Sequence, residues 1–471
     1  MLFNSNYTQA TSYSLLFFLI FFSLSILAQP IDDELGSIPD EKHPSNRGLA
    51  NFDNLDQKLL RIAEKLPDFG GLFFDKNGEL NIYLKNDHPQ PRIERALKHG
   101  LGKGLSRSSL KNPFYKVEEK LLDTKINVLK GKYNYKQFVT WKNLLEKEIF
   151  SVDGVNYLDI DEATNHITIG ASNIDADSEL EIRNHLINLD IPQEAVSIET
   201  MSEAVKLISL RETQPTDNQP SGIVISNGSG VCTLGPKVWA GEYGSTYGFL
   251  TNDHCTSKFG EVTYDRIYQA NNADQSAFIG IESFNPKLIF RDPFRGYKYY
   301  LGDFAFIQTN GGDNSRNIAD TVVMNTDPTT NTHAYEINDS RAFKAVSEEH
   351  EAYVGSPMHK VGRTTGLTYG YVSKTCVNLR SGKSKIIHLC NNIVERVDDS
   401  YPINGSGDSG AAVFEAYDGD RVKLHGVAWG GTDLDFTDVF GRQYFKKFLY
   451  TPMANIREEF NRQGWDLDTL Y

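Results

Sequence analysis

A serine surrounded by glycines in the last quarter of the chain is the strongest candidate for a reactive group. Residues 404–410 read NGSGDSG and place Ser409 directly after Asp408. Glycine lets a backbone turn through conformations that other residues resist, so such a turn can aim successive N–H groups at one point beside the hydroxyl. Acyl transfer needs a nucleophile with donors placed for an oxyanion. The same composition also fits an ordinary surface loop.

Two upstream motifs contain the partners that such a serine needs. Residues 248–255 (GFLTNDHC) lead from an apolar strand pattern into His254, and residues 301–307 (LGDFAFI) place Asp303 before another. A serine hydroxyl needs a base, and that base needs a carboxylate to hold its tautomer. Histidine suits the middle role. In α/β-hydrolases the acid and the histidine follow the serine, whereas here both precede Ser409.

These motifs lie in a part of the chain that has the pattern of β structure. Beyond residue 220, short β-type runs alternate with glycines and turn signals, as in sandwiches and barrels. The last stretch, near residues 452–460, returns to a helical pattern. Residues 211–220 contain two prolines and no apolar residue, and we interpret them as a linker.

Residues 29–210 have a different pattern. An Asn-Gly turn between apolar runs predicts a hairpin over residues 71–84, and Lys/Glu-rich segments with helical spacing follow over residues 91–150. Strand and helix patterns alternate over residues 155–198. We expect a small α+β unit without catalytic residues of its own.

Composition and the N-terminus limit the function classes. The chain has 471 residues and a formal net charge of -14, which argues against nucleic-acid binding. The apolar run 15–28 has the length of a signal-peptide core, so residues 1–28 are interpreted as a signal peptide and the protein as secreted, without a stable membrane anchor. Residues 1–28 contain no Lys or Arg, which leaves an uncleaved anchor as the alternative.

The four cysteines all lie in the second half of the chain. An even number in an exported protein favours disulfides. Zinc is the competing use, but neither neighbouring pair has the short ligand spacing of a structural zinc site, and we expect no metal or other cofactor. The cysteines are Cys232, Cys255, Cys376 and Cys390.

Together the motifs resemble those of the chymotrypsin-like (trypsin-fold) serine peptidases. The likeness is to the secreted, pro-region-bearing bacterial type represented by α-lytic protease and the streptogrisins. It spans roughly residues 221–465 and rests on segments 249–255, 302–307, 359–370 and 407–410. It implies an all-β fold of two six-stranded antiparallel β-barrels with a C-terminal helix, preceded by an α+β pro-region.

The resemblance assigns the catalytic roles. Ser409 would be the nucleophile, His254 the general base and then acid, and Asp303 its orienting partner. The backbone N–H groups of Gly407 and Ser409 would form the oxyanion hole.

The resemblance also implies how the site is supported. Asp408 would be buried and paired with Lys360, because a buried carboxylate without a partner is costly. The implied disulfides are Cys232–Cys255 and Cys376–Cys390.

The primary specificity pocket would have Ile403 as its floor and the segment Ala428, Trp429 and Gly430, continuing to Gly431, as its walls. Since Ile403 is not an acid, we expect an apolar residue at the cleavage site rather than Lys or Arg.

Three departures from the family pattern involve four residues. Asn252 and Asp253 replace a small pair before the histidine, Ala411 replaces a glycine, and Ala428 replaces a serine. None of them removes a reacting group, so we expect activity.

The expected function is therefore a secreted, monomeric serine endopeptidase that acts on protein or peptide substrates and is made as a zymogen. Residues 29–210 would be a pro-region that aids folding or inhibits, and residues 221–471 the peptidase domain. One alternative is a catalytically silent binding protein on the same fold. Another is an unprocessed two-domain protein whose residues 29–210 bind a partner.

Overall fold

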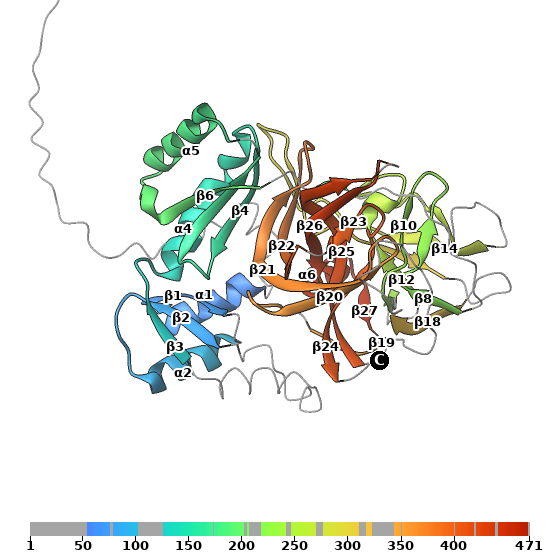
Figure 1. Ribbon diagram of the computed structural model, residues 1–471, viewed down its shortest axis with the longest axis horizontal. Coiled ribbons are helices and arrows are strands. Elements are labelled where there is room, and N and C mark those ends of the chain that lie inside the picture. The colour runs from blue at the N-terminus through green and yellow to red at the C-terminus, as the bar shows by residue number, and fades with distance from the viewer. Residues whose placement is uncertain are drawn as a thin grey trace, which may run out of the picture. The chain divides into compact units, whose positions relative to one another are not determined.

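The protein is described here from a computed structural model, drawn as a ribbon in Figure 1. Residues Pro39–Tyr471 form one compact unit, to which all described residues belong. The interpreted signal peptide, residues 1–28, lies outside them. No helix in the described part of the chain has both the length and the apolar character of a membrane span. The structure describes residues 54–75, 79–101, 126–172, 174–201, 205–206, 218–241, 246–269, 277–309, 317–322, 343–349, 351–399, 401–418, 421–438 and 441–469.

The N-terminal half, which we define as residues 54–206, mixes helices and strands. Asn54 caps α1, and Asn134 begins α4 with a capping box. Strands β1, β2 and β3 form a separate three-stranded sheet. The predicted α+β character is confirmed, although the predicted Asn77-Gly78 turn lies outside the described residues. The elements are α1 (Leu55–Lys65), β1 (Phe69–Phe74), β2 (Leu80–Leu84), α2 (Gln90–Leu101), β3 (Ile126–Lys130), α4 (Tyr135–Glu146), η3 (Ile149–Ser151), β4 (Val155–Asp161), β5 (His166–Ala171), α5 (Ala176–Asn188), η4 (Gln193–Ala195), β6 (Val196–Thr200) and β7 (Val205–Lys206).

The C-terminal half, residues 218–469, contains an eight-stranded sheet. Its apolar side chains form a buried core against the C-terminal helix α6 (Met453–Arg462), where Phe460 stacks on Phe284 with 3.9 Å between ring centroids. The predicted C-terminal helix is confirmed. The sheet order is β10 (Val231–Thr233), β9 (Val224–Ser226), β13 (Arg266–Gln269), β14 (Phe278–Phe284), β17 (Ala305–Gln308), β12 (Thr246–Thr251), β11 (Lys237–Gly241) and β27 (Asp466–Asp468).

A second, sixteen-stranded sheet runs through both halves. Its main path is β15 (Phe290–Arg291), β16 (Lys298–Tyr300), β22 (Ile386–Arg396), β26 (Gln443–Pro452), β25 (Arg421–Thr437), β24 (Ala412–Asp418), β20 (Pro357–Gly362), β21 (Gly366–Arg380), β4, β5 and β6. Attached to this path are β7, β8 (Asn218–Ser221), β18 (Asn317–Val322), β19 (Phe343–Glu348) and β23 (Asn404–Gly405).

The predominance of β structure is confirmed, and the division into two six-stranded barrels stays a prediction. The sheets of the described residues have three, eight and sixteen strands, and strands of the N-terminal half extend the largest one. β8 also begins at Asn218, inside the stretch that we interpreted as a linker.

Buried acids lie where the two halves meet. β4 pairs with β21, with Leu158 opposite Asn378. Close by, both carboxylate oxygens of the buried Asp159 have no hydrogen-bond partner. Lys374 of β21 lies 3.2 Å from Asp161, measured from Nζ to Oδ2. This cluster buries carboxylates that have few donors around them, which favours their protonated forms.

We predict that this cluster makes stability fall as pH rises. Burial raises the pKa of Asp159 from 3.8 to about 8, while Lys374 and Lys142 oppose the shift. The folded chain therefore holds a proton that the unfolded chain releases near pH 4. The stabilising contribution is complete below that pH and is lost as pH rises through about 8. Denaturant unfolding between pH 5 and pH 9 should show a steeper decline for the native chain than for Asp159→Asn. Equal declines would contradict this prediction.

Candidate active site

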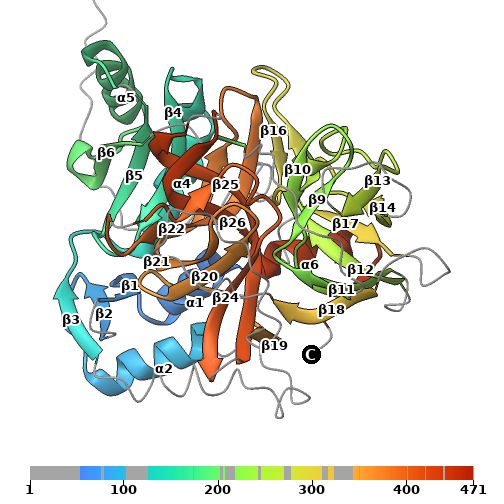
Figure 2. The ribbon, with the colours of Figure 1, turned by 45° about the vertical axis from the view of Figure 1, so that its right-hand side comes forward.

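Two neighbouring strands bring His254 and Asp303 to the same end of the eight-stranded sheet. β12 and β17 are antiparallel neighbours (Figure 2). Thr251 lies opposite Ala305. The chain leaves β12 into the short 3-10 helix η6 (Asp253–Cys255), and Asp303 lies just before β17 begins. Because the end of one strand lies opposite the start of its partner, the two side chains meet although 49 residues separate them.

Ser409 lies in the turn between β23 and β24. Gly407 and Gly410 have φ angles of 102° and 94°, a region that favours glycine. Thr233 of β10 holds this turn, because its N–H donates to the Ser409 carbonyl over 2.6 Å and its Oγ1 donates to the Gly407 carbonyl over 2.8 Å. A Cβ at position 410 would lie 2.2 Å from the Thr233 oxygen, so the approach of β10 requires glycine there.

The structure brings the three residues predicted to be catalytic into one line of contacts. His254 Nε2 lies 2.9 Å from Ser409 Oγ, and His254 Nδ1 lies 2.8 Å from Asp303 Oδ2. The His254 backbone N–H also donates to Asp303 Oδ1 over 3.1 Å. Asp303 and Ser409 are fully buried, and 6% of the His254 side chain is exposed. A carboxylate against Nδ1 fixes the tautomer whose Nε2 can accept a proton from the serine.

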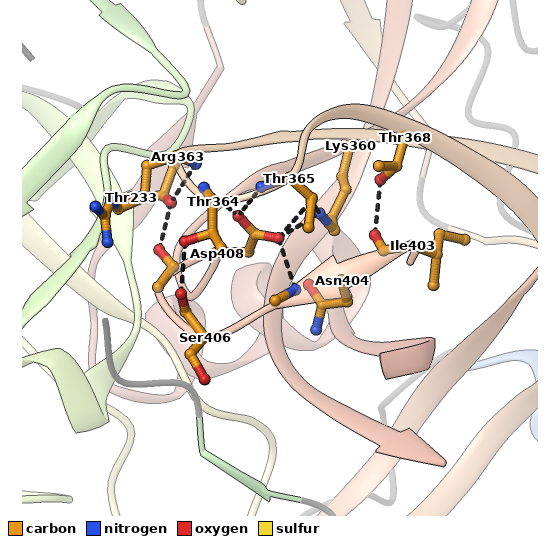
Figure 3. A network of polar contacts seen from close by, with 12 residues as sticks. Thr233, Lys360, Arg363, Thr364, Thr365, Thr368, Ile403, Asn404, Ser406 and Asp408 are labelled. Atoms are coloured by element: carbon orange, nitrogen blue, oxygen red, sulfur yellow. Dashed lines mark hydrogen bonds and ion pairs between the residues drawn. The ribbon is translucent and has the colours of Figure 1, made fainter. Parts of the chain in front are cut away.

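Asp408 has a fully buried carboxylate surrounded by donors (Figure 3). It accepts hydrogen bonds from the N–H groups of Gly405 (2.9 Å) and Thr364 (2.7 Å), and from Thr365 Oγ1 (2.6 Å). Lys360 Nζ lies 2.8 Å from Oδ2, as predicted. Burial lowers the pKa of Lys360 from its ordinary value, and the Asp408 carboxylate opposes that shift. The ion pair and these donors fix Asp408, and with it the backbone of the serine turn.

The N–H groups of Gly407 and Ser409, predicted to form the oxyanion hole, belong to this same turn. A threonine hydroxyl donates to the Ser406 carbonyl over 2.5 Å, and the Ala411 N–H donates to the Asp408 carbonyl over 2.9 Å. Because a peptide unit is planar, fixing these two carbonyls also orients the N–H groups that follow them. Their role as oxyanion donors stays a prediction.

The predicted pocket floor, Ile403, packs into the protein core. Its side chain is fully buried, and its Cδ1 would lie 2.7 Å from a Cβ placed on Gly370 of β21. It belongs to an apolar cluster that includes Val372 and Phe448. Its neighbour Asn404 instead donates a hydrogen bond from Nδ2 to the Gly430 carbonyl over 2.8 Å. Asn404 therefore links the serine turn to β25, a contact that the sequence did not indicate.

The predicted pocket walls lie on β25, beside the serine turn. The Gly410 N–H donates to the Ala428 carbonyl over 2.8 Å. Trp429 is fully buried, and its Nε1 donates to Asn391 Oδ1 over 3.0 Å. Gly430 is also buried and lies opposite Lys206 of β7.

The pairing of β7 with β25 was not predicted. β7 runs antiparallel to β25, with Lys206 opposite Gly430 and Val205 opposite Gly431. A strand of the N-terminal half thus lies against the segment that we expected to bind substrate. Its two residues carry no hydrophobic pattern long enough to identify a strand from sequence.

The structure contains both disulfides that the resemblance implied. Cys232 of β10 is bonded to Cys255 of η6, next to His254, and Cys376 is bonded to Cys390 between β21 and β22. The ligand atoms of Cys232, His254 and Cys255 lie within 4.8 Å of one another. Because the two sulfurs are bonded to each other, they offer no thiolate to a metal ion.

No family model and no curated protein matches this sequence. Among solved structures, the chain is similar to Thermobifida fusca protease A, with 18% identity over 53% of this chain and 98% of that one and a TM-score of 0.33. Nocardiopsis protease has 18% identity over 54% of this chain and 100% of that one, with a TM-score of 0.32. Cellulomonas bogoriensis chymotrypsin has 18% identity over 54% of this chain and 100% of that one, with a TM-score of 0.31.

The solved structures to which the chain is similar are chymotrypsin-like bacterial serine proteases.

Proposed function

We propose that the protein is a serine endopeptidase that hydrolyses peptide bonds through an acyl-enzyme. The observation that carries this proposal is the pair of contacts made by one imidazole, 2.9 Å from Nε2 to Ser409 Oγ and 2.8 Å from Nδ1 to Asp303 Oδ2. A hydroxyl, a base and a buried orienting acid in that order are the parts of an activated serine nucleophile.

In this proposal the reaction has two steps. Ser409 Oγ attacks the substrate carbonyl as His254 Nε2 takes its proton, and Asp303 stabilises the resulting imidazolium. The tetrahedral intermediate places its oxyanion near the Gly407 and Ser409 N–H groups. His254 then protonates the leaving amine. A water molecule, activated by the same base, hydrolyses the acyl-enzyme and regenerates the serine.

The peptide substrate would pair along the edge of β25 near Ala428–Gly431. Two features support this. The segment lies directly beside the serine turn, and β7 already makes antiparallel strand pairs with Gly430 and Gly431. The nearby Ile403 and Asn404 are both uncharged and fully buried. They offer no carboxylate to a lysine or arginine side chain, so we propose an uncharged residue at the cleavage site.

The same contacts support synthesis as a zymogen. β7 occupies the edge that the substrate would need, and Ser409 has no exposed surface in the whole chain. We propose that the N-terminal half acts as an inhibitory pro-region until a cut in or near residues 211–225 allows it to leave. Disulfides are typical of exported proteins, and we propose that residues 1–28 direct secretion.

One observation favours a second possibility, in which the halves stay together after processing. They share a sixteen-stranded sheet and one apolar core cluster that contains side chains from both. A cut chain could then remain a two-part complex.

Fluorophosphonate labelling tests the proposal. The purified chain, incubated until its size on a denaturing gel is constant, should take up one label, and Ser409→Ala should take up none. The labelled species should be shorter by about 190 residues than the chain without its signal peptide, because the proposed cut in or near residues 211–225 removes one domain-sized segment. Equal labelling of both proteins would refute Ser409 as nucleophile. A labelled species of full length would refute the zymogen proposal while leaving the peptidase proposal in place.

A further inference from the structure

Two side chains hold the backbone of Asp303 from opposite sides. Asn252 Nδ2 donates to the Asp303 carbonyl over 2.6 Å, and the Asp303 N–H donates to Thr451 Oγ1 over 3.1 Å. All three residues are fully buried. The peptide groups on both sides of Asp303 are therefore fixed, independently of the contacts that its carboxylate makes with His254.

The Thr451 contact continues to the proposed substrate strand. Thr451 Oγ1 donates to Asn391 Oδ1 over 3.0 Å, and Trp429 Nε1 donates to the same oxygen over 3.0 Å. A Cβ at position 302 would lie 2.2 Å from Thr451 Cγ2, so Gly302 lets the threonine approach this closely. One buried network thus links the backbone of Asp303 to β25.

Asn252 is held in place at a cost. Its Oδ1 is buried and has no hydrogen-bond partner. If this position only had to fill space, an apolar side chain would be more stable there, because it would bury no unpaired acceptor. The amide also has one workable orientation, since Oδ1 facing the Asp303 carbonyl would set two acceptors against each other. What the amide contributes in return is the hydrogen bond that Nδ2 donates to the Asp303 carbonyl.

Asn252 also stands one residue from the helix that carries His254. Its own carbonyl accepts a hydrogen bond from the Cys255 N–H over 3.1 Å, which closes η6 around His254. The residue therefore contacts the backbone of the histidine turn at one end and that of Asp303 at the other. It sets the separation of the two segments whose side chains meet at 2.8 Å.

We propose that Asn252 is a positioning residue for the reaction, which keeps the Asp303 carboxylate aligned with the His254 imidazole. Thr451 assists from the opposite side. The inference depends on the proposed peptidase function. It assigns a role to a position that, on sequence alone, was a departure from the family pattern.

The test is the leucine substitution Asn252→Leu, which keeps approximate volume, removes the donor and also removes the unpaired oxygen. Asn285→Leu is the matched control. Asn285 is also buried and has an unpaired Oδ1. Its Nδ2 donates to the Glu261 carbonyl over 3.0 Å and to Glu282 Oε1 over 2.7 Å, and to no residue of the triad. The full-length chains are processed in the same way, and kcat and KM for one peptide substrate are normalised to fluorophosphonate-titrated sites.

We expect kcat of Asn252→Leu to fall about 10- to 100-fold with KM changed less than about twofold, because a small misplacement of a catalytic group has that effect. Asn285→Leu should keep kcat within about twofold of the native value on the same reasoning. The low-field proton NMR signal of the His254–Asp303 hydrogen bond should weaken or move in Asn252→Leu and not in the control.

The outcomes separate the two proposals. A native chain that hydrolyses no peptide contradicts the proposed function. An active native chain whose Asn252→Leu variant matches the control in kcat and in the NMR signal contradicts this inference. If Asn252→Leu does not fold, Thr451→Val provides the second test, since it preserves shape and removes the acceptor for the Asp303 N–H. Native kcat in that variant would also overturn the inference.

Discussion

Replacing His254 with alanine is expected to lower kcat for peptide hydrolysis by about 10⁴- to 10⁶-fold, the range found for members of such triads. The imidazole is the group that contacts both Ser409 Oγ and Asp303 Oδ2, so its loss removes proton transfer and separates the other two. KM should change little, since the strand proposed to bind substrate does not depend on the ring. Initial rates over long incubations provide the measurement.

Non-additivity gives a sharper form of this prediction. Residues that act as one unit lose their effect together, so His254→Ala combined with Ser409→Ala should be no slower than either single variant. Independent, multiplying losses would show that the two side chains do not act as a unit. A single His254→Ala variant with more than about 1% of native kcat would also contradict the mechanism, on the magnitudes expected for a catalytic base.

The second large effect is expected at the ion pair beneath the serine turn. Lys360→Met should lower the free energy of unfolding by about 3–5 kcal/mol, because it leaves the Asp408 charge buried without its cation. Both side chains are fully buried, with 2.8 Å between Nζ and Oδ2. Denaturant unfolding followed by intrinsic fluorescence measures the change.

Two further variants test the cause of that loss. Lys258→Met removes a pair with Glu261 in which both side chains are more than half exposed, and should cost less than about 1 kcal/mol. Adding Asp408→Asn to Lys360→Met should restore part of the stability, since it removes the uncompensated charge. If Lys360→Met and Lys258→Met have the same effect, the buried pair is not what holds the turn.

The sequence indicated the residues of the candidate site better than most of the contacts that hold them. His254, Asp303 and Ser409 could be found because each lies in a short motif with a definite chain order. The Lys360–Asp408 pair and both disulfides followed from the resemblance. In each case a local run of residues carries the signal, and the fold brings the runs together.

The contacts that were missed depend on strand register across long separations. Asn252 reaches Asp303 across 51 residues and Asp303 reaches Thr451 across 148, and no local pattern marks either contact. Ile403 was placed in the pocket by counting back from the serine, and that role stays a prediction; the position of its side chain next to Gly370 depends on tertiary packing. The larger sheet is extended because β4 joins β21 from far upstream in the chain, which no local pattern indicates.

The pairing of β4 with β21 has a consequence for a chain whose halves part. At Asn378 and Leu379, β21 is hydrogen-bonded to β4, so departure of the N-terminal half would leave backbone donors and acceptors unpaired along that margin. Unpaired strand margins recruit other extended chains. Maturation would thus expose an unpaired strand edge at the same time as it produces activity. A concentrated preparation of the separated C-terminal half is expected to self-associate through that edge.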